Sequence, residues 1–110
     1  MTLFQQVQSF EDFAERPGSK FLFIEEVGCR HCAQMDKALG EILARTQRSG
    51  WSFFRLNLED DPKVSNALGL VGTPALVRFQ DGETNYSIWI GAEYLDELSD
   101  WMDLDAKSST

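Results

Sequence analysis

The chain has 110 residues, which is the usual size of a single domain that buries one hydrophobic core. Hydrophobic residues make up 43% of the composition and aromatic residues 12%, which indicates a globular rather than a disordered protein. The formal net charge is −8. We therefore expect neither nucleic acid nor an anionic membrane surface as the main partner, because both are bound through basic patches.

The N-terminal stretch MTLFQQVQSFEDF has no basic region followed by an apolar segment of signal-peptide length, and no later run approaches a membrane span. We therefore expect a cytoplasmic protein. The chain contains no internal repeat and no linker, so we expect one domain over residues 1–105, followed by a polar, disordered tail over 106–110.

The first elements that can be assigned to particular residues are a short helix and a buried strand. Ser9, followed three positions later by Asp12, resembles a capping box that opens a helix, and Pro17 and Gly18 end that helix. The run FLFI over residues 21–24 has four consecutive apolar residues, which is typical of a strand buried on both faces.

Both cysteines and the only histidine follow this strand, in the stretch VGCRHC over residues 27–32. Beyond Cys32 the apolar residues recur at helical spacing, and Gly50 is the expected end of that helix. The apolar stripe consists of Met35, Leu39, Ile42 and Leu43. The cysteines are therefore expected where a buried strand turns into a helix.

The next elements are a strand over residues 51–58 and a second short helix. The acidic, proline-marked stretch 60–62 indicates the start of that helix, and Gly69 its end. The aromatic residues spaced along the strands are expected in the core, and these are Phe21, Phe23, Phe53, Phe54 and Phe79.

A hairpin and an amphipathic helix complete the predicted fold. The run ALVRF over 75–79 and the stretch 86–90 flank a turn at 81–82. The last helix carries Leu95, Leu98, Trp101 and Met102 on one face, and Glu93, Asp96, Glu97 and Asp100 on the other. We expect its end to fray, because Asp103 and Asp105 oppose the helix dipole there.

The expected order is strand, helix, strand, helix, strand, helix, two strands in a hairpin, and helix. Alternation of strands and helices favours parallel pairing, whereas a hairpin adds antiparallel strands. We therefore predict an α/β fold with a central mixed β-sheet that is flanked by helices on both faces.

Several motifs in this order resemble the thioredoxin family across nearly the whole chain. They are the CXXC motif from Cys29 to Cys32 at a strand-to-helix junction, NLEDDP after the next strand, GTP over 72–74 before the hairpin, DGE in the turn, and Gly91 after the last strand. A CXXC motif alone is a weak signal, but in a βαβ setting it indicates a redox site. The resemblance implies a thioredoxin-like fold.

The resemblance also implies how a client protein is bound. It implies a cis peptide bond between Thr73 and Pro74 that places Thr73 beside the cysteines. The Thr73 backbone would pair with an extended client segment, in a groove that also includes Gly28 and Gly91. Disulfide-containing proteins are the implied clients, and a thioredoxin reductase or a glutathione system is the implied electron donor.

The chain departs from the family pattern at several positions. Gly28 stands where the family usually has tryptophan, and Arg30 and His31 stand where it commonly has Gly-Pro. Phe23 replaces a buried acid, and Lys37 replaces a proline that kinks the helix. In the family that acid accepts the proton of the second cysteine, and Phe23 cannot take this role.

Redox chemistry at the motif needs a thiolate as nucleophile. Cys29 is expected at a helix N-terminus, where the free backbone N–H groups and the helix dipole stabilise a thiolate. Cys32 lies one turn further on and can attack the mixed disulfide between Cys29 and a client. We therefore assign Cys29 as nucleophile and Cys32 as resolving thiol, with their disulfide as the redox group and no other cofactor.

Arg30 and, when protonated, His31 place positive charge near the Cys29 sulfur. A lower pKa of Cys29 stabilises the reduced form, so we expect a more oxidising couple than that of a thioredoxin with Gly-Pro between its cysteines. The alternative is that Arg30 and His31 are ordinary solvated surface residues without influence on the sulfur.

Glu25 is the candidate to replace the missing acid, because it lies two residues after Phe23 on the same face of the strand and nearer the cysteines. Alternatively, Glu25 and Glu26 form a solvated strand end. Arg55 stands where the family often has a lysine near the acid, and it is expected either to pair with Glu25 or to reach solvent.

Three functions remain open at this point. The first is a thiol-disulfide oxidoreductase that acts on protein or small-molecule disulfides. The second is a non-catalytic binding module that holds a partner in the groove of Gly28, Thr73 and Gly91, and the loss of the tryptophan and the acid favours it. The third is a metal site, which would need a dimer or a partner to complete four ligands, with Pro74 in the way. We expect no metal.

Overall fold

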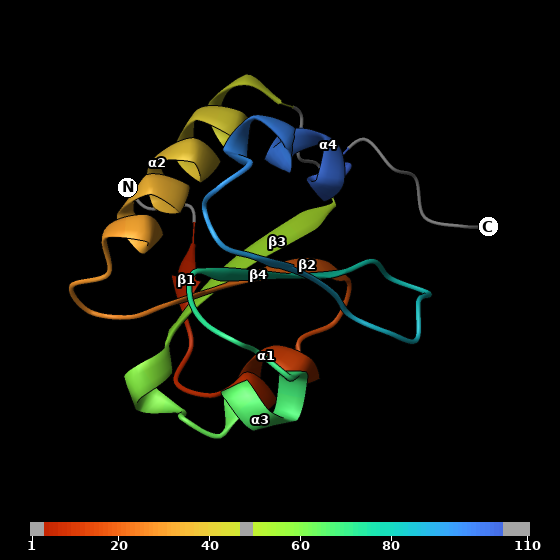
Figure 1. Cartoon of the computed structure of the whole chain (residues 1–110). Coiled ribbons are helices and arrows are strands. Elements are labelled where there is room, and N and C mark those ends of the chain that lie inside the picture. The colour runs from red at the N-terminus through yellow and green to blue at the C-terminus, as the bar shows by residue number, and fades with distance from the viewer. Residues whose placement is uncertain (1–3, 47–49, 105–110) are drawn as a thin grey trace.

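The structure is a computed structural model that describes residues 4–46 and 50–104. In this part of the chain, five strands form one mixed sheet in the order β1-β3-β2-β4-β5 (Figure 1). The strands are β1 (Gln5–Gln6), β2 (Ser19–Glu25), β3 (Trp51–Asn57), β4 (Ala75–Phe79) and β5 (Ser87–Ile90). β1 and β2 run parallel to β3, whereas β4 runs antiparallel to both β2 and β5. The predicted mixed sheet is confirmed.

Helices cover both faces of this sheet, as predicted. The α-helices are α1 (Phe10–Glu15), α2 (Arg30–Arg45), α3 (Val64–Leu68) and α4 (Leu98–Met102). Short 3-10 turns over Leu58–Asp60 and Leu95–Glu97 precede α3 and α4. Figure 1 shows α2 and α4 on one face and α1 and α3 on the other. Within the described residues, no helix is long and apolar enough to cross a membrane.

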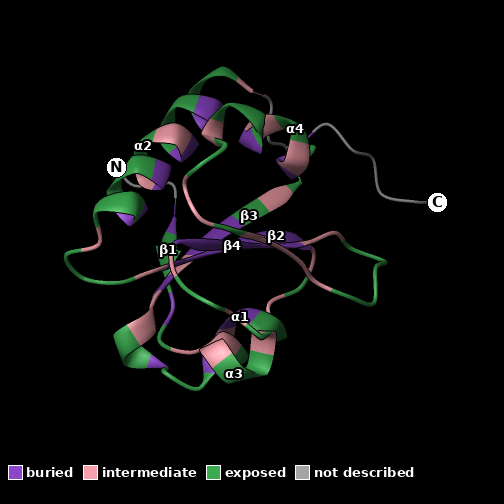
Figure 2. Cartoon of the chain, in the orientation of Figure 1, coloured by how far each residue is buried: buried purple, intermediate pink, exposed green. Residues whose placement is uncertain are grey.

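The central strand β2 supplies side chains to two separate core layers. Phe21 and Phe23 point into the layer under α2 and α4, whereas Leu22 and Ile24 point into the layer under α1 and α3. All four are completely buried, which confirms the predicted strand (Figure 2). The predicted stripe of α2 packs on the first layer, and it consists of Met35, Leu39, Ile42 and Leu43.

Helix α1 is held at both ends by side chains. The Ser9 hydroxyl accepts a hydrogen bond from the Asp12 backbone N–H at 3.1 Å, which confirms the predicted cap. At the other end, the buried Lys20 ammonium donates to three backbone carbonyls. Its partners are Phe13 at 2.8 Å, Ala14 at 3.1 Å and Arg16 at 2.5 Å. The burial of Lys20 was not predicted, because a lysine just before an apolar strand is ordinarily a surface residue.

The helix boundaries differ from the predicted ones in two places. Helix α2 ends at Arg45 rather than near Gly50, because Thr46 adopts an extended conformation. The last predicted helix is split into a 3-10 turn and α4, and Asp103 ends it in a left-handed conformation. Asp105 and the predicted tail 106–110 lie outside the described residues.

The hairpin is confirmed with a defined register. Ala75 pairs with Ile90, and Arg78 pairs with Ser87, so the connection includes the predicted turn at 81–82. The predicted strand 86–90 begins one residue later than expected. In this pairing Ile90 lies directly opposite the first residue of β4, which places the end of β5 beside the segment that precedes β4.

Candidate active site at the start of helix α2

A disulfide joins Cys29 and Cys32 at the N-terminus of α2. Cys29 is the N-cap residue, and its sulfur accepts a hydrogen bond from the Cys32 backbone N–H at 3.1 Å. A sulfur that replaces the usual oxygen cap faces the free N–H groups of the first turn, where negative charge is stabilised. The two sulfurs differ in access, because Cys32 is only 2% exposed whereas Cys29 is half-buried.

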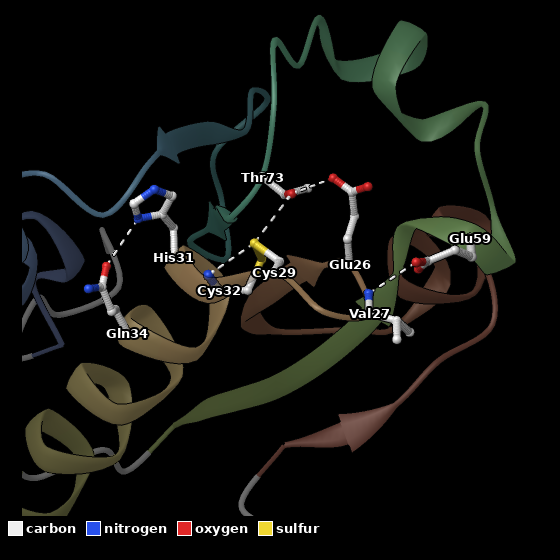
Figure 3. Close-up of a disulfide and its surroundings, with 8 residues drawn as sticks. All are labelled: Glu26, Val27, Cys29, His31, Cys32, Gln34, Glu59 and Thr73. Atoms are coloured by element: carbon white, nitrogen blue, oxygen red, sulfur yellow. Dashed lines mark hydrogen bonds between the residues drawn. A yellow bond between two sulfur atoms is a disulfide. The ribbon is translucent and has the colours of Figure 1, made fainter.

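The segment before β4 lies beside this disulfide. A cis peptide bond joins Thr73 and Pro74, and the Thr73 hydroxyl oxygen is 3.9 Å from the Cys29 sulfur (Figure 3). The Gly91 backbone N–H donates to the Pro74 carbonyl at 2.8 Å, so the end of β5 is tied to the same segment. Residues far apart in the sequence thus meet around Cys29.

Two of the predicted groove residues are glycines for conformational reasons. Gly28 has φ 77° and Gly91 has φ 94°, and a Cβ atom at either position would meet no other atom within 4 Å. The left-handed backbone, rather than a lack of space, therefore requires glycine at these positions.

Two carboxylates connect the loop before Cys29 to other segments. The Thr73 hydroxyl donates to Glu26 Oε1 at 2.6 Å, and the Val27 backbone N–H donates to Glu59 Oε2 at 3.0 Å. Figure 3 shows both contacts on the same side of the Cys29 sulfur. Glu26 is exposed, as the alternative of a solvated strand end predicts, but it has a defined hydrogen-bond partner.

His31 is turned away from the sulfur. Its Nδ1 atom lies 3.1 Å from Oε1 of Gln34, one turn further along α2 (Figure 3). Arg30 is exposed and lines the same cleft as Cys29. Of Arg30 and His31, Arg30 is therefore the better placed to act on the thiolate.

Beneath the disulfide, two carboxylates share one guanidinium. Arg55 donates to Glu25 at 3.1 Å and to Asp36 at 2.8 Å, and its guanidinium lies over the Phe4 and Phe23 rings. Arg55 thus pairs with Glu25 rather than reaching solvent. Burial raises the pKa of Glu25 above its ordinary value of 4.5, the Arg55 charge opposes this rise, and Asp36 and Glu59 add to it.

The Glu25 side chain is 18% exposed and ion-paired with Arg55, so it is more buried than the alternative of a solvated strand end predicts. An open cleft of about 650 Å³ brings Glu25, Asp36 and Arg55 together with both cysteines. The other residues that line it are Gln6, Glu26, Val27, Gly28, Arg30, Ala33 and Asn57.

No protein-family model matches the sequence, and no curated protein matches it. Solved structures do match. A thioredoxin from Malassezia sympodialis is 16% identical, with a TM-score of 0.72, over 90% of this chain and 87% of that chain. Mitochondrial thioredoxin 3 from Saccharomyces cerevisiae, in its oxidised form, is 15% identical, with a TM-score of 0.73, over 90% and 92% of the two chains. Chloroplastic thioredoxin z is 16% identical, with a TM-score of 0.67, over 94% and 96%.

The chain has the thioredoxin fold. This confirms the resemblance drawn from the CXXC, GTP and DGE stretches as far as the fold is concerned. Phe23, which stands where the thioredoxin pattern has a buried acid, is completely buried in the core layer under α2. Glu25, two residues further along β2, is a half-buried carboxylate at the edge of the core rather than within it.

One residue and one contact of the site escaped the sequence analysis. Asp36 completes the pairing of Arg55, and its position four residues after Cys32, on the same face of α2, is a signal that was available. The Glu26 contact with Thr73 joins residues 47 positions apart, so local sequence carries no trace of it. In the described ranges, no three His, Cys, Asp or Glu side chains are grouped so that they could hold a metal ion.

Proposed function

We propose that the chain is a thiol-disulfide oxidoreductase that cycles Cys29 and Cys32 between dithiol and disulfide. The observation that supports this most directly is the disulfide at the N-terminus of α2, with its outer sulfur beside Thr73 and the cis Pro74. Disulfide-containing proteins are the proposed clients, with a thioredoxin reductase or a glutathione system as electron donor. The cytoplasm is the proposed location.

The different exposure of the two cysteines supports their proposed roles. In the reduced protein the Cys29 thiolate attacks a client disulfide, a new bond forms between Cys29 and the client, and the other client sulfur leaves as a thiolate. Cys32 then attacks the Cys29 sulfur, and the second client thiolate leaves. Two electrons pass to the client, and its two thiolates take up protons. Cys32 is buried, so a client can reach only Cys29 of the pair.

Glu25 is the proposed acceptor of the Cys32 proton. Both side chains line the same cleft, and a carboxyl whose pKa is raised by burial is better suited to hold a proton near neutral pH. We expect Glu25→Gln to slow resolution of the mixed disulfide at neutral pH while leaving the initial attack of Cys29 unchanged. Stopped-flow kinetics with a fluorescent disulfide separates the two steps, and an unchanged resolution rate would remove Glu25 from this role.

The proposed client groove runs over Gly28, Thr73, Pro74 and Gly91. A client segment would pair with the Thr73 backbone as an added strand. Two exposed apolar side chains flank this line, since Val27 is 81% exposed and Val71 is 89% exposed. Exposed apolar groups beside an accessible sulfur support contact with a protein client.

The proposed couple is more oxidising than that of a thioredoxin with Gly-Pro between its cysteines. The backbone N–H of Cys32 donates to the Cys29 sulfur, and Arg30 adds positive charge to the same cleft. Both stabilise the thiolate, and hence the reduced protein. The orientation of His31 toward Gln34 leaves Arg30 as the main tuning side chain of the motif.

A trapping experiment tests the proposed reaction. Cys32→Ser removes the resolving thiol, so a client attacked by Cys29 stays attached as a mixed disulfide that mass spectrometry detects. We expect Cys32→Ser to accumulate this adduct with a model disulfide peptide, and Cys29→Ser to form none. If neither variant forms an adduct, while unmodified protein binds the peptide without reducing it, the groove serves as a non-catalytic binding module.

A further inference from the structure

The Thr73 hydroxyl lies between a carboxylate and the reactive sulfur. It donates to Glu26 Oε1 at 2.6 Å, and its oxygen is 3.9 Å from the Cys29 sulfur (Figure 3). A hydroxyl has one hydrogen to donate and two lone pairs. Because that hydrogen points at Glu26, the Thr73 oxygen presents lone pairs to Cys29.

This orientation discriminates between the two forms of reduced Cys29. A thiol can donate its S–H to the Thr73 oxygen, which completes a chain of hydrogen bonds that ends on the Glu26 carboxylate. A thiolate has no hydrogen and meets lone pairs instead. The Thr73 hydroxyl could donate a hydrogen bond to the thiolate only by giving up its hydrogen bond to Glu26.

We propose that Glu26 is a positioning residue that acts through the Thr73 hydroxyl to favour the thiol form of Cys29. The inference rests on the proposed function, whose nucleophile it regulates. The helix N-terminus and Arg30 stabilise the Cys29 thiolate, whereas Glu26 favours the thiol. Glu26 therefore limits how oxidising the Cys29–Cys32 couple becomes.

The other charged groups near Cys29 have different partners. Glu25 and Asp36 are both paired with Arg55, and Glu59 accepts a hydrogen bond from the Val27 backbone. Arg30 favours the thiolate by its charge, and His31 faces Gln34. Glu26 is the carboxylate that accepts the hydrogen bond of the hydroxyl beside the sulfur. Glu59 contacts the same loop from the 3-10 turn Leu58–Asp60 and offers a matched control.

The test titrates Cys29 in a Cys32→Ser background, where it is the only cysteine, by following thiolate absorbance against pH. We expect Glu26→Ala to lower the pKa of Cys29, with a thiolate fraction about tenfold larger at a fixed pH, as for loss of one hydrogen bond to a charged group. Glu26→Gln keeps an acceptor but not the charge, so a smaller change in the same direction is expected. Glu59→Gln should leave the titration unchanged.

Thr73→Val separates the relay from a direct effect of charge. If Glu26 acts through Thr73, Glu26→Ala changes the thiolate fraction much less when Thr73 is already valine. The proposal would be overturned if Glu26→Ala changed the thiolate fraction of Cys29 equally with threonine and with valine at position 73. It would also be overturned if, with Thr73 in place, neither Glu26 variant changed the thiolate fraction. Far-UV circular dichroism confirms that each variant is folded.

Failure of this inference is distinguishable from failure of the proposed function. The titration needs only the thiol of Cys29 and no turnover. In protein with both cysteines, Glu26→Ala should also make the reduction potential less negative, by about 30 mV for a tenfold change. If Glu26→Ala shifts the Cys29 titration but the protein forms no reversible disulfide, the role of Glu26 stands and the proposed oxidoreductase function fails. If the titration does not shift but the disulfide forms reversibly, the oxidoreductase function stands and the role of Glu26 fails.

Discussion

Two ionisable residues of this chain, Lys20 and Glu25, have pKa values that burial shifts. Lys20 is 2% exposed, its ammonium caps the C-terminal carbonyls of α1, and it lies 4.6 Å from the centre of the Phe13 ring. Burial lowers the pKa of Lys20 from its ordinary value of 10.5. Glu25 is the counterpart on the other core layer, with a raised pKa. We therefore expect substitutions of Lys20 and Glu25 to change the free energy of unfolding.

Replacing Lys20 by methionine should destabilise the protein. The apolar stem is largely retained, but the carbonyls of Phe13, Ala14 and Arg16 lose their donor. The free energy of unfolding in urea should fall by about 1–3 kcal/mol, as for buried acceptors left unsatisfied. The matched control is Lys63→Met, at an exposed lysine, which should change the free energy of unfolding by less than about 0.5 kcal/mol. A Lys20→Met variant as stable as the parent would contradict this role.

Glu25 should make stability depend on pH. Its folded pKa is raised above 4.5, so the native state binds its proton more tightly than the unfolded state does. The stability from this group is fully present below pH 4.5 and is lost as the pH rises through the folded pKa. The Glu25→Gln variant has no carboxyl to lose a proton, so its free energy of unfolding should rise relative to that of the parent between pH 4 and pH 7. Urea unfolding of the oxidised proteins at each pH measures this difference. A relative stability that stays constant or falls with pH would show that burial does not dominate at Glu25.

At the scale of elements, the strands could be predicted closely and the helix ends could not. The run ALVRF coincides with β4, and FLFI with the buried core of β2, because apolar runs bounded by turn residues leave few alternatives. The end of α2 at Arg45 depends on the extended backbone of Thr46, for which the sequence had no strong signal before Gly50. The split of the last helix likewise follows from packing rather than from its apolar stripe.

Replacing Gly40, inside α2, and Gly91, just after β5, by alanine should change the free energy of unfolding in opposite directions. Gly40 lies inside α2 with open space around it and ordinary helical φ, so Gly40→Ala should stabilise the protein by about 1 kcal/mol. Gly91 has φ 94°, so Gly91→Ala should destabilise it by about 1–3 kcal/mol and disturb the contact with Pro74. Urea unfolding measures both effects. Stabilisation by Gly91→Ala would show that the left-handed backbone there is not required.

On the scale of the whole molecule, the sheet brings three separate segments to one end of α2. The strand β2 leads to Cys29, the segment just before β4 supplies Thr73 and Pro74, and Gly91 directly follows β5. The cysteine pair and the position of Thr73 beside it could be predicted, because both belong to short sequence motifs. The links from Arg55 to Asp36 and from Glu26 to Thr73 could not, because they are side-chain contacts between segments that only the folded chain brings together.

The central claim is that Cys29 and Cys32 form a reversible redox couple. The most direct measurement is a titration of the protein in buffers of defined thiol-disulfide ratio, with free thiols alkylated and counted by mass. The account predicts a single two-electron transition, at a potential between that of a reducing thioredoxin, about −270 mV, and that of a strong oxidant, about −120 mV. A protein whose two thiols remain free at every ratio would contradict the claim.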